Sequence, residues 1–305
     1  MAGQLLQAIL PLTQIFFPTD PFYLARQDSY WSNNAKLQPA CIVQPNSTHE
    51  VSLVLQTLVQ SNTSFAIRSG GHMNWAGANN IDGGVTIDLG LLRSTVYDPV
   101  TETATLGPGA TWLEVYTELH KYQRAVAGGR EGNVGVGGLI LGGGNTFFTA
   151  RHGFACGNVI SFEVVLASGE IVTADRDTNA DLFRVLKGAG SGNFGIVTSF
   201  TMATIVNDQI WGGMTFSPKE VIPGAISAMV NFTETVEANP DNNLIVIIGH
   251  SPQFNDNHIA TLVLNTAGVE APSEYDEYLA LPSFLNMIGN TTLKDAVAYA
   301  VPGNQ

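Results

Sequence analysis

The stretch that decides how this chain is interpreted is Arg68-Ser69-Gly70-Gly71-His72, which follows the short apolar strand signal Phe65-Ala66-Ile67. Two adjacent glycines let the backbone turn sharply and direct its N–H groups at an anion, and Arg68 adds a fixed positive charge. A diphosphate would fit such a loop. His72 at the loop exit could serve as a base, a metal ligand or a point of covalent attachment. A plain surface turn with an incidental histidine explains these five residues equally well, because Gly-Gly occurs in many ordinary loops.

Composition excludes several classes of partner. The 305 residues are 45% hydrophobic with 32 glycines, which is typical of a globular, loop-rich protein. The net charge is −13 and no Lys/Arg cluster interrupts it, so we expect no nucleic acid as a partner. No apolar run reaches the ~18 residues of a membrane span, and we expect no membrane partner. Cys41 and Cys156 show no metal-ligand spacing, so no metal site is predicted.

The sequence leaves localisation open. Residues 1–17 are apolar but lack a basic start and a convincing cleavage site, so they are a poor signal peptide. We expect a secretory protein if a signal peptide is missing from this sequence, and a cytoplasmic one otherwise. Four N-glycosylation sequons favour secretion weakly, at Asn46, Asn62, Asn231 and Asn290.

The order of patterns along the chain predicts two domains of mixed strands and helices. Residues 1–35 contain scattered prolines and little periodicity, and we expect an irregular lead-in. Between residues 36 and 206, strand signals alternate with helix signals such as the one from Thr48, whose side chain can cap, to Ser61. Beyond residue 206 glycines become rare and the strands longer, so residues 207–305 are expected to form a second domain.

Glycines are densest between Gly128 and Gly144, and a second glycine-rich loop spans Gly188–Gly195. The residues between the central glycines are apolar and would be buried, so the backbone there is predicted to lie against a large flat ligand. A dinucleotide-binding G-x-G-x-x-G turn is the obvious competitor. It fails, because after Gly135-Val136-Gly137 the third glycine would fall at Ile140.

Six motifs in order make the pattern specific. They are Arg68–His72, Gly84–Leu89, Gly107–Trp112, Gly128–Gly144, Arg151–Asn158 and Gly192–Thr198. Over roughly residues 28–215 the chain resembles the FAD-linked oxidases of the berberine-bridge type, within the p-cresol methylhydroxylase and vanillyl-alcohol oxidase family. The resemblance implies an α+β fold: an FAD-binding domain of the p-cresol methylhydroxylase type, made of two α+β subdomains over residues 36–206, followed by a partial α+β substrate domain.

The resemblance also implies roles for single residues. Arg68–Gly71 would wrap the diphosphate, and His72 would bond covalently to the methyl carbon on the benzene ring of the flavin. Val134 matches the position beside the oxygen-reactive carbon, where a small side chain favours oxidases. Many members carry a second, cysteinyl link, and the matching residue here is Glu131. The full predicted set of cofactor-binding residues is Arg68, Ser69, Gly70, Gly71, His72, Gly129, Val134, Gly135, Gly137, Gly138, Gly142, Gly143, Gly144, Asn158, Val159, Gly195, Ile196 and Val197.

The predicted function is therefore an FAD-dependent oxidoreductase, an oxidase that removes hydride from a small organic substrate and passes electrons to molecular oxygen. No catalytic base can be named from the residues present. The resemblance implies that family members continue past Gln305, so we expect a shortened product, a fragment or an incomplete gene. The alternative function is a truncated, non-catalytic flavin-binding remnant.

Overall fold

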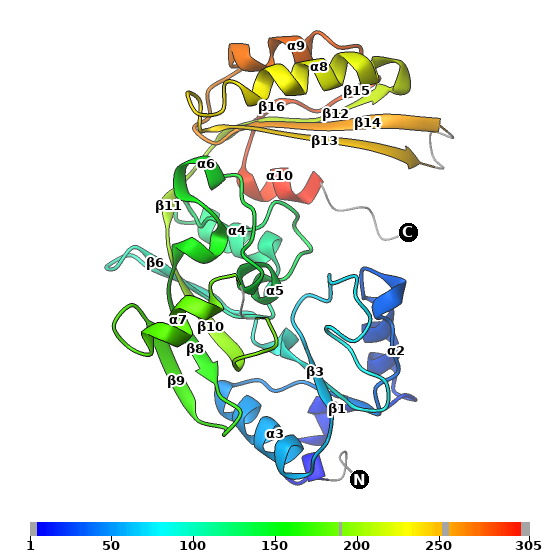
Figure 1. Ribbon diagram of the computed structural model, residues 1–305, viewed down its shortest axis with the longest axis vertical. Helices are drawn as coiled ribbons and strands as arrows, with labels where there is room; N and C mark the ends of the chain where they lie inside the picture. Colours follow the sequence, from blue (N-terminus) through cyan, green and yellow to red (C-terminus); the bar gives the residue numbers. More distant parts are fainter. Residues whose placement is uncertain (1–4, 189–190, 252–255, 300–305) are drawn as a thin grey trace.

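The computed structural model describes residues 5–188, 191–251 and 256–299. Ala189 and Gly190 of the predicted loop at 188–195 lie outside the described residues, as do the ends of the first and last predicted segments. Within the described part, three larger sheets follow one another along the chain (Figure 1).

The first subdomain is built on a four-stranded sheet of order β1-β2-β4-β3. Its strands are β1 (Ile15–Phe16), β2 (Cys41–Val43), β3 (Phe65–Arg68) and β4 (Val85–Asp88). Because β2, β4 and β3 run parallel, a crossover is needed, and helix α3 (Thr48–Gln60) supplies it. The predicted helix is confirmed with one correction. Ser47, the last residue with extended backbone, accepts the N–H of Glu50 at 3.2 Å, so Ser47 and not Thr48 is the cap.

The expected irregular lead-in is an ordered part of the first subdomain. Strand β1 pairs with β2, and helix α2 (Pro21–Asp28) begins at a proline, which is favoured in the first turn. Leu6, Leu10 and Ile15 are buried in the core beneath α3. Periodicity does not reveal these elements, because each is too short to repeat an apolar pattern.

The second subdomain carries a five-stranded antiparallel sheet of order β5-β6-β10-β8-β9. Its strands are β5 (Thr95–Asp98), β6 (Thr103–Leu106), β8 (Val159–Val165), β9 (Ile171–Asp175) and β10 (Ile196–Ala203), and the small pair β7 (Arg124–Ala125) and β11 (Ile205–Val206) lies apart. The predicted hairpin over Val159–Thr173 is confirmed as β8 and β9. Its helices are α4 (Trp112–His120), α5 (Val136–Leu141), α6 (Thr149–His152) and α7 (Ala180–Leu186).

A third sheet follows near the predicted boundary at residue 206. Its strands are β12 (Ile210–Pro218), β13 (Asn242–Ser251), β14 (Asp256–Asn265) and β15 (Leu285–Asn286), with β16 (Gly289–Thr291) also paired to β12. Helices α8 (Ile222–Thr233) and α9 (Asp276–Leu279) cover one face (Figure 1). Short 3-10 helices complete the described chain, at Leu12–Gln14, Asn33–Ala35, Leu89–Leu91, Ala155–Asn158, Lys219–Val221 and Ser273–Tyr275.

Helix α10 (Leu293–Tyr299) lies on the other side of the third sheet, between it and the second subdomain (Figure 1). Leu293, Ala296 and Val297 join the same hydrophobic core as α4, and the carbonyl of Val297 accepts the N–H of Gly132 at 3.1 Å. The last described helix is therefore shared between the predicted second domain and the FAD-binding part.

Two further findings concern residues discussed above. Cys41 and Cys156 are free thiols. Across the described ranges, no helix combines the length and the apolar character that a membrane crossing requires.

Candidate functional site

A cluster of buried charges lies directly under the loop that follows β3. Arg68 is only 1% exposed; its Nη1 donates to the carbonyl of Arg26 at 2.6 Å and its Nη2 to Oγ of Ser29 at 2.8 Å. Asp88, fully buried at the end of β4, accepts two hydrogen bonds from Arg26 at 2.5 and 2.8 Å. The carboxylate of Asp88 thus pairs with Arg26, and the guanidinium of Arg68 is held by uncharged groups, so these three side chains together carry an excess positive charge.

The charge of Arg68 acts from beneath the loop. Its guanidinium lies 3.8 Å from the ring centre of Tyr30, a cation–π contact. Burial, and then the nearby charge of Arg26, lower the pKa of Arg68, and burial raises the pKa of Tyr30 to about 12. Nε of Arg68 has no hydrogen-bond partner within the described ranges. Gly71 covers it with a left-handed backbone (φ 76°), and a Cβ there would lie 2.9 Å from Nε. The side chain of Arg68 is thus buried beneath the loop, and its predicted role at the diphosphate stays a prediction.

The two glycine segments predicted to bind one ligand touch each other. A Cβ on Gly135 would lie 2.4 Å from the backbone nitrogen of Gly70, and a Cβ on Gly70 would lie 2.5 Å from that of Gly135. Ser69 supports the contact, because its hydroxyl donates to the carbonyl of Pro108 at 2.5 Å and lies 3.2 Å from the place of a Cβ on Gly137. The first and second subdomains therefore meet backbone against backbone.

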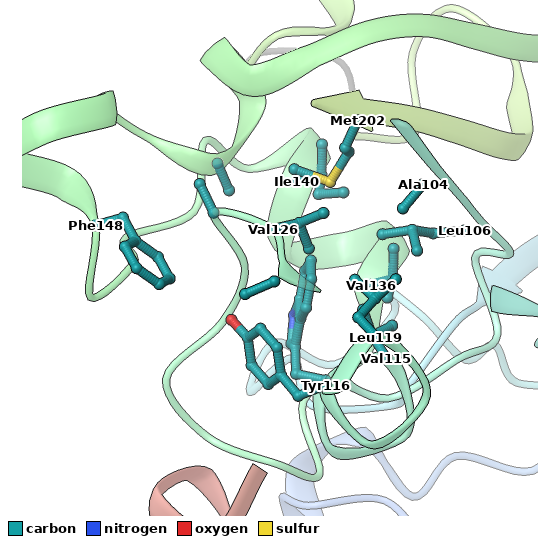
Figure 2. Close-up of a cluster of buried hydrophobic side chains, with 14 of the residues drawn as sticks. Ala104, Leu106, Val115, Tyr116, Leu119, Val126, Val136, Ile140, Phe148 and Met202 are labelled. Carbon is teal, nitrogen blue, oxygen red and sulfur yellow. The ribbon is translucent and has the colours of Figure 1, made fainter. Parts of the chain in front are cut away.

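Other glycines of the central segment are explained by the protein core. Added Cβ atoms at Gly128 and Gly129 would lie 2.1 and 2.4 Å from ring atoms of the fully buried Trp112. The hydroxyl of Tyr116 donates to the carbonyl of Gly129 at 3.0 Å, and Gly144 packs against Leu139. Figure 2 shows the same core, with Val115, Tyr116 and Leu119 beside Val126, Val136 and Ile140.

A third group of glycines faces open space. Cβ atoms added at Gly138 and Gly143 would meet nothing within 4 Å, although Gly143 has a left-handed backbone (φ 101°). Gly138 is exposed in α5, where alanine would favour the helix by about 0.5–1 kcal/mol. Gly142 ends this helix and approaches only its carbonyls. Packing gives no reason for glycine at 138, whereas the close approach of a ligand does.

His72 lies at the exit of the loop between an aromatic ring and a carboxylate. Its imidazole stacks on the indole of Trp31, with ring centres 4.8 Å apart and planes at 24°. Nε2 of His72 lies 3.7 Å from Oε2 of Glu131, and the two side chains are 32% and 24% exposed. The two positions that the resemblance gives to covalent links are therefore neighbours. A hollow of about 450 Å³ is lined by Asn34 and by residues 74–76, which follow His72 in the chain.

The remaining predicted residues lie in packed positions. Val159, Ile196 and Val197 are 3% exposed on paired strands of the second sheet. The side chain of Asn158 donates to the carbonyls of His152 and Phe154 at 2.9 and 3.0 Å, and a Cβ on Gly195 would meet Val164. Val134 is half-buried at the edge of the core. Each position has a packing reason of its own, and contact with a cofactor stays a prediction.

The sequence interpretation missed the residues that support the loop at residues 68–72. They lie on α2, in the segment after it and at the end of β4, and they are Arg26, Ser29, Tyr30, Trp31 and Asp88. One signal was present. Asp88 is the last residue of the strand Val85–Asp88, whose four residues are all buried. A carboxylate in such a place requires a buried cation. The identity of that cation could not be deduced, because Arg26 is 62 residues away.

Comparison with known proteins shows which family the chain belongs to. Residues 39–175 match the family described as FAD binding domain. The chain is 40% identical over 288 residues to the FAD-dependent monooxygenase drtC of Aspergillus calidoustus, covering 93% of this chain and 55% of that relative. The chain thus spans little more than half the length of this curated relative.

Two solved structures share the fold. 6-Hydroxy-D-nicotine oxidase from Arthrobacter nicotinovorans superimposes with a TM-score of 0.82 at 22% identity, over 93% of this chain and 62% of that one. The berberine-bridge-enzyme-like protein 1 of Physcomitrella patens gives 0.78 at 21% identity, over 95% and 62%. The predicted α+β fold of the p-cresol methylhydroxylase type is confirmed.

Proposed function

Because this chain contains an FAD binding domain and belongs to the FAD-dependent oxidoreductase family, we propose that it binds FAD between the loop at residues 68–72 and the segment at 134–144 and works as an oxidase. The observation that carries the proposal is the contact of Gly70 with Gly135. It joins the two glycine segments into one surface, and the glycines at 138 and 143 leave that segment open.

The residues present fit a diphosphate. The loop offers backbone N–H groups, and the buried cluster of Arg26, Arg68 and Asp88 supplies an excess positive charge beneath it. In a chain of net charge −13, this local excess counters the general repulsion of an anion.

The residues at the loop exit fit the flavin end. His72 is partly exposed and its ring plane is fixed by Trp31, so the imidazole is presented in one orientation. We propose that His72 holds FAD covalently. Bound there, the flavin supplies a two-electron acceptor for hydride removed from a small organic substrate. Val134, half-buried at the edge of the core, would leave room for oxygen beside it.

Acid denaturation tests the attachment. The purified protein is precipitated with acid, and flavin is measured in the washed pellet and in the supernatant. We expect flavin in the pellet of the wild type and in the supernatant of His72→Ala. His152→Ala, an exposed histidine on α6, is the matched control and should keep flavin in the pellet. Acid-stable flavin in His72→Ala would contradict the assignment.

Reaction with oxygen can be measured without knowing the substrate. The bound flavin is reduced with dithionite and mixed with aerated buffer, and reoxidation is followed by absorbance. We expect the wild type to reoxidise faster than Val134→Leu, because the larger side chain occupies the path of oxygen. Equal rates would argue against the role of Val134. The relative drtC is named a monooxygenase, so once a substrate is found, labelled oxygen distinguishes the two outcomes: peroxide from an oxidase, or product oxygen from a monooxygenase.

A further inference from the structure

Glu131 has a buried carboxylate oxygen that accepts no hydrogen bond within the described part of the chain. Its Oε1 accepts the N–H of Asn133 at 3.1 Å, which fixes the carboxylate. Its Oε2 is buried and has no hydrogen-bond partner among the residues that the structure describes. An unsatisfied buried carboxylate oxygen is unfavourable, so its position requires an explanation.

This oxygen pairs with the imidazole of His72, whose Nε2 lies 3.7 Å away. A hydrogen bond would need the two atoms to approach by a little under 1 Å. The imidazole is supported beside Glu131 by its stacking on the indole of Trp31, with the two planes at 24°. The backbone of Trp31 also donates to the carbonyl of Gly71 at 3.2 Å, which ties the indole to the same loop.

The backbone around Glu131 is held as well. The N–H of the next residue, Gly132, donates to Val297 on α10 at 3.1 Å. The carbonyl of Gly132 in turn accepts the N–H of Leu113 on α4 at 3.0 Å. The backbone beside both His72 and Glu131 is therefore held by hydrogen bonds. Only their side chains need to move for the imidazole and the carboxylate to form a hydrogen bond.

We infer that Glu131 is a positioning residue for the attachment of FAD to His72, an inference that rests on the proposed function. A neutral imidazole has one N–H and one lone pair, and the partner of one nitrogen selects the state of the other. Glu131 holds the proton on Nε2, so Nδ1 carries the lone pair. Nδ1 is then the atom that bonds to the methyl carbon of the flavin.

The charge of Glu131 matters in this reaction as well as its hydrogen bond. As the Nδ1–carbon bond forms, the methyl carbon loses one proton, and the imidazole becomes positive until its Nε2 proton passes to Glu131. The lone pair of Nδ1 forms the new bond, and the two electrons of the broken C–H bond enter the flavin ring system and pass from it to oxygen. Overall, one N–H and one C–H hydrogen leave with oxygen as hydrogen peroxide, and one N–C bond is gained.

The test compares the rate of covalent attachment in matched variants. Apo-protein is mixed with FAD in air, and samples are acid-precipitated over time to follow flavin in the pellet. Flavin retained by native samples on a desalting column reports binding before attachment. The variants are Glu131→Gln, Glu131→Ala and Glu131→Asp, with Glu118→Gln as control, since Glu118 pairs with Lys121 on the surface of α4.

We expect Glu131→Gln and Glu131→Ala to bind FAD like the wild type but to attach it roughly 10²-fold more slowly, the usual contribution of a proton-accepting group. Glu131→Asp should recover part of the rate, and added formate should accelerate Glu131→Ala, which a merely structural role would not explain. Attachment at the wild-type rate in Glu131→Gln overturns this inference alone. Absence of acid-stable flavin in the wild type overturns the covalent link itself, and with it this inference.

Discussion

The glycines of the central segment divide into two groups that look alike in the sequence. At Gly128, Gly129 and Gly135 the space of a side chain is already filled by protein, at 2.1–2.4 Å from the nearest atom. At Gly138 and Gly143 the same space is open to 4 Å or more. The first group is required by the packing of the protein, and for the second we proposed contact with a flavin.

This difference shows that a dense glycine run can combine two unrelated requirements. Core packing and ligand approach both exclude a Cβ, but they do so at different glycines of the same segment. Substitution with alanine distinguishes the two requirements. At a packing glycine it lowers the stability of the apo-protein, whereas at a ligand-facing glycine it weakens only the binding of the cofactor.

The largest effect is expected for Gly135→Ala. Its Cβ would lie 2.4 Å from the backbone nitrogen of Gly70, and neither backbone can move without separating two subdomains. We expect a loss of about 3 kcal/mol in the free energy of unfolding, the upper end of what overpacking costs. Urea unfolding of the apo-protein measures it. Gly157→Ala, where a Cβ meets nothing within 4 Å, is the control, and equal stability of the two variants would contradict the packing role.

A smaller loss is expected for Gly128→Ala. Its Cβ would lie 2.1 Å from the ring of Trp112, which is fully buried but is a side chain and can shift. We expect a loss of about 1–3 kcal/mol. The double variant with Trp112→Leu should lose less than the sum of the two single losses, because the smaller side chain makes room. Strict additivity in urea unfolding would show that the two residues do not interact.

The smallest effect on the fold is expected for Gly138→Ala. The apo-protein should be equally stable or gain up to about 1 kcal/mol, because alanine favours the helix. FAD should bind roughly tenfold more weakly, about 1.4 kcal/mol, since the methyl group occupies ligand space. A flavin fluorescence titration in the His72→Ala background measures binding without attachment. Unchanged affinity would mean that Gly138 does not face the cofactor.

Much of the architecture follows from local patterns. The crossover helix α3 and the β8–β9 hairpin are visible in the sequence because the period of the helix and the turn of the hairpin are long enough to recognise. The first 35 residues were not predictable in this way. Their elements are two to eight residues long and are stabilised by contacts such as Arg26 with Asp88, which no local pattern contains.

The candidate site was predicted only in part for a similar reason. The motif order located the loop and the glycine segment, but it could not show which glycines are filled by Trp112 and which stay open. It also placed Arg68 at the ligand, because a charged side chain beside a glycine loop is usually exposed. The structure places that side chain on Tyr30, so the supporting charge is recognised only when α2 is in view.

The hydrogen bond between Val297 and Gly132 gives the molecule a mechanical property that chain order hides. Helix α10 contacts β12 of the third sheet through the shared core, and it also holds the residue next to Glu131. If the third sheet moved and α10 moved with it, the hydrogen bond from Gly132 to Val297 would transmit the movement to the backbone of Glu131 beside His72. One short helix thus couples the third sheet to the backbone beside Glu131 and His72.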